Sequence, residues 1–438
     1  MKNKYKKIIL IIILFFTILG YTMVISIPRY DEIWEYGYAY NIATGLIPYK
    51  DFNMVSTPLY PFIVSIFIKV FGHYLLSAHI FNAIIITIML LILYKMLGKK
   101  SFILVPLIFT YSDPTYNNLL LFFFFLLLYI KNQNIKDSKK EIITAIIISL
   151  MFLTKQSVGA AFFILELFLS KNKIRYIITF IIPILILIIY LTINNALYNF
   201  IDYTLLGLFD FAGRNGTISI YLFISIIICI TLIILYKKYN KKEILYALAY
   251  QIISFPIFDE YHTIIAIIPF IFILLNNLDY KEYRTKYFIT MTIFVLLLYI
   301  TPKYDGKIIL NNNYMFGRKV NFVAIEVIDK TTKIYTKYEK EYDKIFNFTR
   351  YTYLIKIYQE KTIDKYDMVL NGNMGYKGHN KYIKEIDNYC NKNKCLFIIS
   401  TTPLNKYSQQ NYEITNYILD NYNKIDEDKY LYYEFYSN

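Results

Sequence analysis

The sequence predicts an α-helical polytopic membrane protein with about eleven transmembrane helices, followed by a small α/β domain at the C-terminus. Three observations lead to this fold class. The 438 residues are 56% hydrophobic with a mean hydropathy of +0.38, which is more apolar than soluble folds are. Apolar runs of membrane-spanning length recur along the chain. Lysine and arginine collect on one side of the resulting topology, as the positive-inside rule requires.

Five apolar runs come close to the roughly 20 residues that a helix needs to cross a bilayer core of about 30 Å. They cover residues 8–27, 76–94, 176–193, 218–236 and 287–301. Four lysines precede the first run, and no small-residue cleavage site follows it. We therefore expect an uncleaved signal anchor that keeps the N-terminus in the cytoplasm.

Three further apolar stretches, 101–131, 142–170 and 243–280, are too long for one crossing and carry polar residues near their middles. Each has basic residues at both ends, and basic loops stay on the cytoplasmic side. Each is therefore expected to be a hairpin of two helices whose tip faces outward. This topology places the basic residues of 1–301 in cytoplasmic segments except for Arg29, Lys50, Lys69, Lys155 and Arg214.

The formal net charge of +15 follows mostly from this orientation signal, so it calls for no nucleic-acid partner. The localisation predicted from these patterns is the cell membrane, with many crossings and the N-terminus in the cytoplasm. Residues 1–301 form the transmembrane domain of this prediction.

Residues 302–438 are rich in Tyr, Lys, Asn and Asp and contain no further span. An odd number of crossings places this segment outside the cytoplasm. Short apolar strands alternate there with amphipathic helices, at 344–348, 349–360, 366–370, 379–389, 395–400 and 408–422. The alternation predicts an extracytoplasmic α/β domain with a largely parallel sheet. The sequence leaves open whether Cys390 and Cys395 form a disulfide or remain two thiols.

The first outer loop, residues 28–74, carries an acidic pair directly after the first span. Asp31 and Glu32 precede Trp34, Tyr38 and Ile42, which recur every four residues. That period predicts an amphipathic helix on the membrane surface with Trp34 as interfacial anchor. Asp31 lies at its N-terminus, where the helix dipole favours an ionised carboxylate that can act as a general base. A lone Asp at such a position is more often a simple helix cap.

Each hairpin tip adds polar groups on the same side of the membrane, at residues 112–118, 154–156 and 258–262. Hairpin helices of about 13 to 15 residues, at 1.5 Å each, fall short of a full bilayer. The tips are therefore expected to line a cavity recessed below the outer surface, where ionisable residues are costly and usually functional. The residues expected to converge there with Asp31 are Asp113, Lys155, Asp259, Glu260 and His262.

After the acidic pair and the predicted surface helix, residues 45–59 read G-x-x-P-Y-x-D-F-x-x-x-x-x-P-L. This combination resembles the membrane glycosyltransferases of the GT-C fold, in particular the bacterial protein O-mannosyltransferase and aminoarabinose transferase superfamily. The resemblance covers roughly residues 1–300 and is strongest over 28–75. It implies transfer of a sugar from a polyprenyl-phosphate-linked donor to an acceptor on the outer face of the cytoplasmic membrane, with inversion.

The resemblance also implies roles for individual residues. Asp31 would deprotonate the acceptor and Asp113 would assist, with Glu32 as a third catalytic candidate. A cation must offset the charge of the leaving phosphate, and Lys155 is the first choice, although a lysine at a membrane edge can simply snorkel. The substrate-binding candidates are Tyr49, Lys155, Gln156, Arg214, Asp259, Glu260, Tyr261 and His262.

The partners implied by the resemblance are the lipid-linked sugar donor, membrane lipid, and a glycan, lipid or protein acceptor. No cofactor and no metal site are expected. A divalent cation is left open, because acidic pairs near a phosphate can hold one.

Two alternatives remain. A polysaccharide polymerase or ligase shares the membrane and the donor class, and we expect it to have several arginines in a large outer loop, whereas residues 194–217 contain only Arg214. A transporter or flippase of a lipid-linked or anionic substrate belongs to another class and predicts symmetric repeats and polar residues through the bilayer depth. The inner halves of the hairpins are instead almost purely aliphatic, with Glu166 as the main exception.

Overall fold

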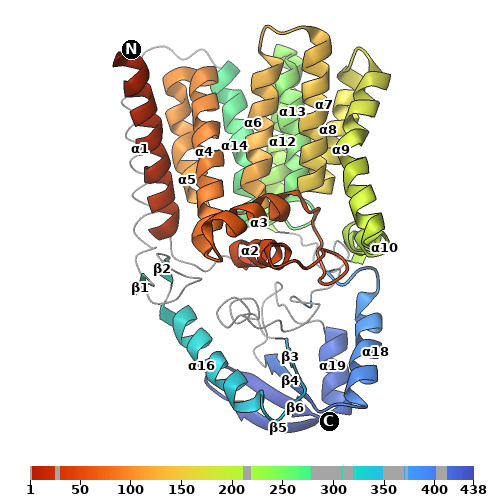
Figure 1. The fold of residues 1–438 in the computed structure, drawn as a ribbon. Helices are drawn as coiled ribbons and strands as arrows, with labels where there is room; N and C mark the ends of the chain where they lie inside the picture. The colour runs from red at the N-terminus through yellow and green to blue at the C-terminus, as the bar shows by residue number, and fades with distance from the viewer. Residues whose placement is uncertain are drawn as a thin grey trace.

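The structure is a computed structural model that describes residues 2–24, 30–210, 219–277, 307–308, 319–320, 322–348, 369, 373–400 and 412–438. Figure 1 shows a bundle of upright helices with a smaller α/β part at one of its ends. The bundle end that faces the α/β part is called the domain end, and the opposite end is called the far end.

The bundle helices run between these two ends. In the described residues they are α1 (Lys2–Val24), α4 (Leu75–Leu97), α5 (Leu104–Thr110), α6 (Tyr116–Lys131), α7 (Asp137–Thr154), α8 (Gln156–Leu169), α9 (Lys173–Ile193), α12 (Ile220–Tyr239), α13 (Lys242–Tyr250) and α14 (Glu260–Asn277). Five helical segments there are long and apolar enough to cross a bilayer. The multi-pass membrane architecture is thereby confirmed, and the expected span at 287–301 lies outside the described residues.

The three predicted hairpins are present. A short turn after α5 leads into α6, α7 meets α8 at Lys155, and α13 returns through the 3₁₀ turn η3 (Gln251–Ser254) into α14. Figure 1 shows the connection between α6 and α7 at the far end, so the hairpin tips lie at the domain end. With 14 residues, α8 is only about 21 Å long, shorter than a bilayer core of about 30 Å.

Helices α7 and α8 cross closely at Gly159. A Cβ atom there would lie 2.1 Å from the Cα and 2.3 Å from the backbone nitrogen of Phe152. Because neither backbone atom can move without shifting α7, only glycine allows this crossing.

We expect Gly159→Ala to destabilise the protein by about 1–3 kcal/mol, since one helix has to shift to make room for the methyl group. The measurement is thermal unfolding in detergent. Gly20→Ala on α1 is the matched control, because a Cβ at Gly20 meets nothing within 4 Å. Equal unfolding temperatures for the two variants would contradict the close crossing.

Two helices, α2 (Tyr30–Ala43) and α3 (Leu59–Phe71), lie across the domain end of the bundle (Figure 1). Asp31 and Glu32 fall in the first turn of α2, as predicted. The prediction that the apolar residues of this helix face the membrane is wrong, because Tyr38 and Ile42 are buried in the protein. Tyr38 stacks on Phe52, with ring centroids 5.9 Å apart. The loop after α2 folds back and covers the apolar side of this helix. The helical period of the apolar residues does not tell whether they face protein or lipid.

The α/β part contains a four-stranded sheet in the order β3-β4-β6-β5. Its elements are α16 (Phe322–Tyr338), β3 (Lys344–Asn347), α18 (Gly378–Cys390), β4 (Cys395–Ser400), α19 (Tyr412–Asn421), β5 (Asn423–Asp428) and β6 (Tyr433–Ser437). A separate antiparallel pair consists of β1 (Lys307–Ile308) and β2 (Lys319–Val320). All side chains of β4 are buried, so this central strand forms the core of the sheet.

Strands β3 and β4 and helix α18 confirm the predicted elements at 344–348, 395–400 and 379–389. The predicted helix 349–360 lies outside the described residues, and so does the predicted strand 366–370 apart from Val369. A largely parallel sheet is wrong for the described strands: β3 and β4 are parallel, but β6 is antiparallel to both β4 and β5. The sequence missed this last hairpin because β5 is a charged, mostly exposed edge strand without apolar alternation. The structure pairs Cys390 with Cys395 in a disulfide.

Candidate active site

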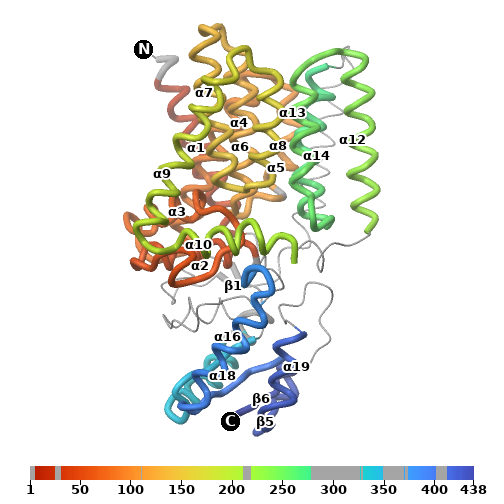
Figure 2. Tube along the Cα trace, turned by 90° about the vertical axis from the view of Figure 1, so that its right-hand side faces the viewer, coloured from red at the N-terminus to blue at the C-terminus, as the bar shows by residue number. Residues whose placement is uncertain are grey.

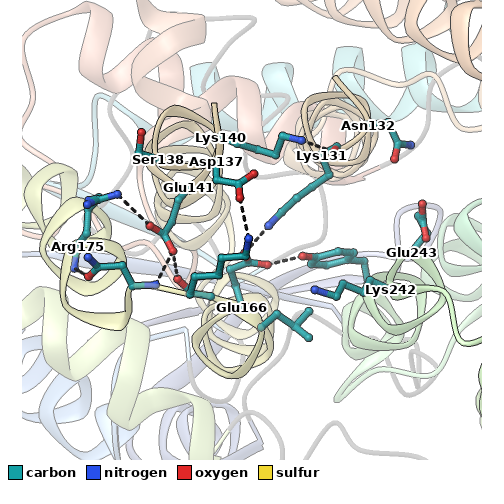
Figure 3. A pocket seen from close by; sticks show the side chains of 15 residues that line it. Lys131, Asn132, Asp137, Ser138, Lys140, Glu141, Glu166, Arg175, Lys242 and Glu243 are labelled. Atoms are coloured by element: carbon teal, nitrogen blue, oxygen red, sulfur yellow. Dashed lines mark hydrogen bonds and ion pairs between the residues drawn. The ribbon is translucent and has the colours of Figure 1, made fainter. Parts of the chain in front are cut away.

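A polar cavity of about 590 Å³ opens at the far end of the bundle (Figure 3). Six of its charged side chains form three ion pairs. Glu166, the acidic exception among the aliphatic hairpins, is buried and binds both Lys131 and the hydroxyl of Tyr246. Around it, Lys171 lies 2.7 Å from Asp137 and Arg175 lies 3.5 Å from Glu141. These contacts join α6, α7, α8, α13 and the start of α9, so we assign the network a structural role.

A second cavity, of about 170 Å³, lies at the domain end, where the sequence predicts the site. Separate segments of the chain supply its walls. They are Asp31 and Trp34 of α2, Val55 and Ser56 of the following loop, Tyr116 of α6, residues 155–157 of the α7–α8 tip, Leu208, Ile253, residues 255–257, and His262 of α14. Its chemistry therefore depends on how these segments fold against one another.

Asp31 reaches the cavity from the first turn of α2. One turn later Glu35 is almost completely buried. Burial, with a further contribution from the negative charge of Asp31, raises the pKa of Glu35 well above its usual range. Glu35 is not among the residues predicted from the sequence, although its spacing of four residues from Asp31 places both carboxyl groups on one face of the helix.

Lys155 lies between the last residue of α7 and the first of α8. Its Nζ donates to the carbonyl oxygen of Ile253 at 3.1 Å and lies 5.5 Å from the ring centroid of Tyr116. These contacts hold the ammonium group at the cavity, where it can meet an anion.

Gln156 connects two walls of the cavity. Its Nε2 donates to the carbonyl oxygen of Thr204 at 2.8 Å and to that of Val55 at 3.3 Å. The first bond reaches η2 (Asp202–Leu206), a π-helical turn that follows α10 (Leu197–Ile201). Gln156 therefore fixes the separation between this turn and the first loop.

The α13–α14 tip presents His262 to the cavity. Asp259 orients it: Oδ1 of Asp259 accepts hydrogen bonds from the backbone nitrogen of His262 at 2.8 Å and from its Nδ1 at 2.9 Å. Burial opposes ionisation of Asp259, but the bonds and charge of His262 prevail and hold the pKa of this carboxyl below its usual range. The ring of His262 is thus held in one orientation by an ionised carboxylate.

Two neighbours in this tip connect it to the α5–α6 tip and do not line the cavity. Glu260 accepts a hydrogen bond from the Tyr111 hydroxyl at 3.2 Å. The hydroxyl of Tyr261 lies 2.9 Å from Oγ1 of Thr115. Both contacts hold the two tips together beside the cavity.

The remaining candidates also lie away from the lining. Glu32 is fully buried and lies 2.8 Å from Nε2 of His79, whose Nδ1 lies 3.0 Å from Oγ1 of Thr22. Asp113 is buried in the turn before α6. Tyr49 is fully buried and donates to the carbonyl oxygen of Ser56 at 2.7 Å. Arg214 lies outside the described residues.

The structure therefore brings Asp31, Lys155, Gln156 and His262 to one cavity. The cavity also contains residues that were not predicted as site residues, above all Trp34 and Ser56. Nε1 of Trp34 and Oγ of Ser56 are buried and have no hydrogen-bond partner within the described part of the chain. Because buried polar atoms are rarely left unpaired, both are suited to contact a polar ligand. Among the described residues, no three His, Cys, Asp or Glu side chains come together as a metal site would require.

A helical bundle with two crosswise helices over a cavity at one end, and a mixed α/β part beyond them, defines a membrane protein of the GT-C fold. No family model and no curated protein matches the sequence. Two solved structures are similar over 99% of this chain and 98% of theirs, both with a TM-score of 0.56. They are ArnT from Cupriavidus metallidurans bound to undecaprenyl phosphate, at 9% identity, and the same protein in the apo state, at 8%. The GT-C fold expected from the sequence is thereby confirmed.

Proposed function

We propose that this protein is a glycosyltransferase that moves a sugar from a polyprenyl-phosphate-linked donor to an acceptor. The observation that carries the proposal is the meeting of Asp31, Lys155 and His262 in one cavity at the domain end of the bundle. The similarity to a structure bound to undecaprenyl phosphate supports a lipid phosphate as the donor's carrier.

In the proposed reaction, the Asp31 carboxylate takes the proton of an acceptor hydroxyl. The acceptor oxygen then forms a bond to the anomeric carbon, and the bond from that carbon to the phosphate oxygen breaks. Its electron pair leaves with the polyprenyl phosphate, and the ammonium of Lys155 offsets the negative charge that develops there. A single displacement of this kind inverts the anomeric carbon.

We further propose that the domain end faces outward and the N-terminus lies in the cytoplasm. The basic residues support this orientation, since Lys2, Lys4, Lys6 and Lys7 lie in the first turns of α1 and the loops at the far end are rich in lysine. Basic loops are retained on the cytoplasmic side. The donor then enters the cavity sideways from the outer leaflet.

The test is a transfer assay with the purified protein in lipid nanodiscs and a panel of labelled sugars linked to undecaprenyl phosphate. We expect release of undecaprenyl phosphate together with a glycosylated acceptor for one member of the panel, and we expect EDTA to leave the rate unchanged. Absence of undecaprenyl phosphate binding would contradict the proposed donor. Loss of transfer in EDTA, restored by Mg²⁺, would contradict metal independence.

A further inference from the structure

The α/β part contacts the bundle through residues 373–378, named here the docking turn, and through the start of α18. In the docking turn the backbone nitrogen of Tyr376 donates to Oδ1 of Asp202 at 3.0 Å, and that of Lys377 donates to Oδ2 of Asp210 at 2.6 Å. From α18, Nζ of Lys381 lies 2.8 Å from Oδ2 of Asp202. Figure 2 shows α18 directly beneath α10, in agreement with these contacts.

The docking turn also binds the first loop. Nδ2 of Asn53 donates to the carbonyl oxygen of Asn373 at 2.6 Å. Both asparagines are buried. The docking turn therefore holds two segments of the bundle that lie about 150 residues apart in sequence, namely the loop after α2 and the segment from Asp202 to Asp210.

The fit at Asp202 is tight. Gly375 has a φ of +86°, and a Cβ there would lie 2.5 Å from a carboxylate oxygen of Asp202. Glycine alone combines this backbone conformation with this approach. Asp202 is itself buried, so losing the amide and ammonium groups that the α/β part supplies would leave a buried carboxylate without these partners.

Both segments held by the docking turn form walls of the cavity. Asn53 precedes Val55 and Ser56, which line it, and Asp202 and Asp210 flank Leu208, which also lines it. Gln156 connects the same two segments from the cavity side, through the carbonyl oxygens of Val55 and Thr204. The two walls are thus joined once inside the cavity and once by the α/β part.

We propose that the docking turn positions the active site: it sets the separation of the two cavity walls between which the donor's phosphate and sugar lie. Asp202 of η2 and Lys381 of α18, which pair beside the docking turn, are the positioning residues, and neither lines the cavity. Its effect on catalysis rests on the proposed function, whereas its effect on the cavity wall does not. The α/β part is therefore a component of the site in addition to any part it takes in recognising the acceptor.

The first test measures the wall directly and needs no activity. In a Cys229→Ser background, Leu208→Cys supplies one reactive thiol, because Cys390 and Cys395 are paired. We expect Asp202→Ala to raise the rate of labelling by a membrane-impermeant maleimide about tenfold, because each charged hydrogen bond lost favours opening of the wall. Gly375→Ala provides a second, independent way of undocking the turn. Lys384 is an exposed lysine of α18, and Lys384→Ala is the control, which should leave the labelling rate unchanged.

The second test measures transfer by the full-length protein. We expect Lys381→Ala to raise KM for the lipid-linked donor about tenfold with a smaller change in kcat, and Lys381→Arg to restore it, because the arginine retains the ion pair with Asp202. Unchanged labelling in both Asp202→Ala and Gly375→Ala overturns the proposal, whether or not transfer is observed. Faster labelling with an unchanged KM overturns the positioning role while leaving the proposed function intact.

Discussion

Replacing Asp31 by asparagine is expected to lower the rate of sugar transfer about a thousandfold, the contribution typical of a lost general base. Asparagine keeps the size of the side chain and its place in the first turn of α2, but it cannot accept the acceptor's proton. Glu35, one turn away, is not expected to replace it, because this carboxyl is buried and does not line the cavity, and burial with the neighbouring charge raises its pKa, which opposes the ionised form. The measurement is single-turnover transfer from a labelled lipid-linked sugar.

Binding separates loss of chemistry from loss of structure in this experiment. Asp31→Asn should still bind undecaprenyl phosphate, since the substitution removes a negative charge from a cavity that would hold an anion. Asp329→Asn, an exposed acid of α16, is the matched control and should transfer at the wild-type rate. Full transfer by a folded Asp31→Asn protein would show that another group is the base.

Replacing Lys155 by glutamine is expected to lower kcat/KM about a hundredfold, because the cation that offsets the charge of the leaving phosphate is lost. The loss should appear both in transfer and in direct binding of undecaprenyl phosphate. Lys155→Arg should retain part of the activity, since the charge remains while its geometry changes.

Lys50→Gln is the matched control for this substitution. Lys50 is an exposed lysine of the first loop and does not line the cavity. We expect the Lys50→Gln variant to bind undecaprenyl phosphate as the wild type does. Equal losses in the two variants would assign the effect to general surface charge, and wild-type binding by Lys155→Gln would remove Lys155 from the phosphate site.

The topology was largely predictable from the sequence. Long apolar runs and basic loops act locally and additively, so the positions of the hairpins follow from residue order alone. The turn at Lys155 between α7 and α8 lies near the middle of the stretch 142–170, as the basic residues at both ends of that stretch predict. The last sheet hairpin was not predictable in this way, because the charged strand β5 owes its conformation to its neighbour β6.

The candidate site was predictable only in part. Lys155 and His262 were identified because charged residues at hairpin tips are costly, and Asp31 because it follows the first span at the N-terminus of a helix. The cavity brings the three residues together. Glu32 has the same signal in the sequence as Asp31, yet its side chain packs against His79 inside the bundle. Adjacent residues on a helix point about 100° apart, so the orientation of α2 determines which of the two carboxylates faces the cavity.

The sequence by itself determined that the chain crosses a membrane repeatedly, where its hairpins turn, and which end gathers charged side chains. These properties depend on the hydrophobicity and charge of short segments, whatever those segments contact. Only the tertiary structure decided that Trp34 faces a cavity, that Glu35 is buried beside Asp31, and that the docking turn contacts Asp202. Such contacts join residues far apart in the chain, and their geometry is fixed only when whole helices pack together.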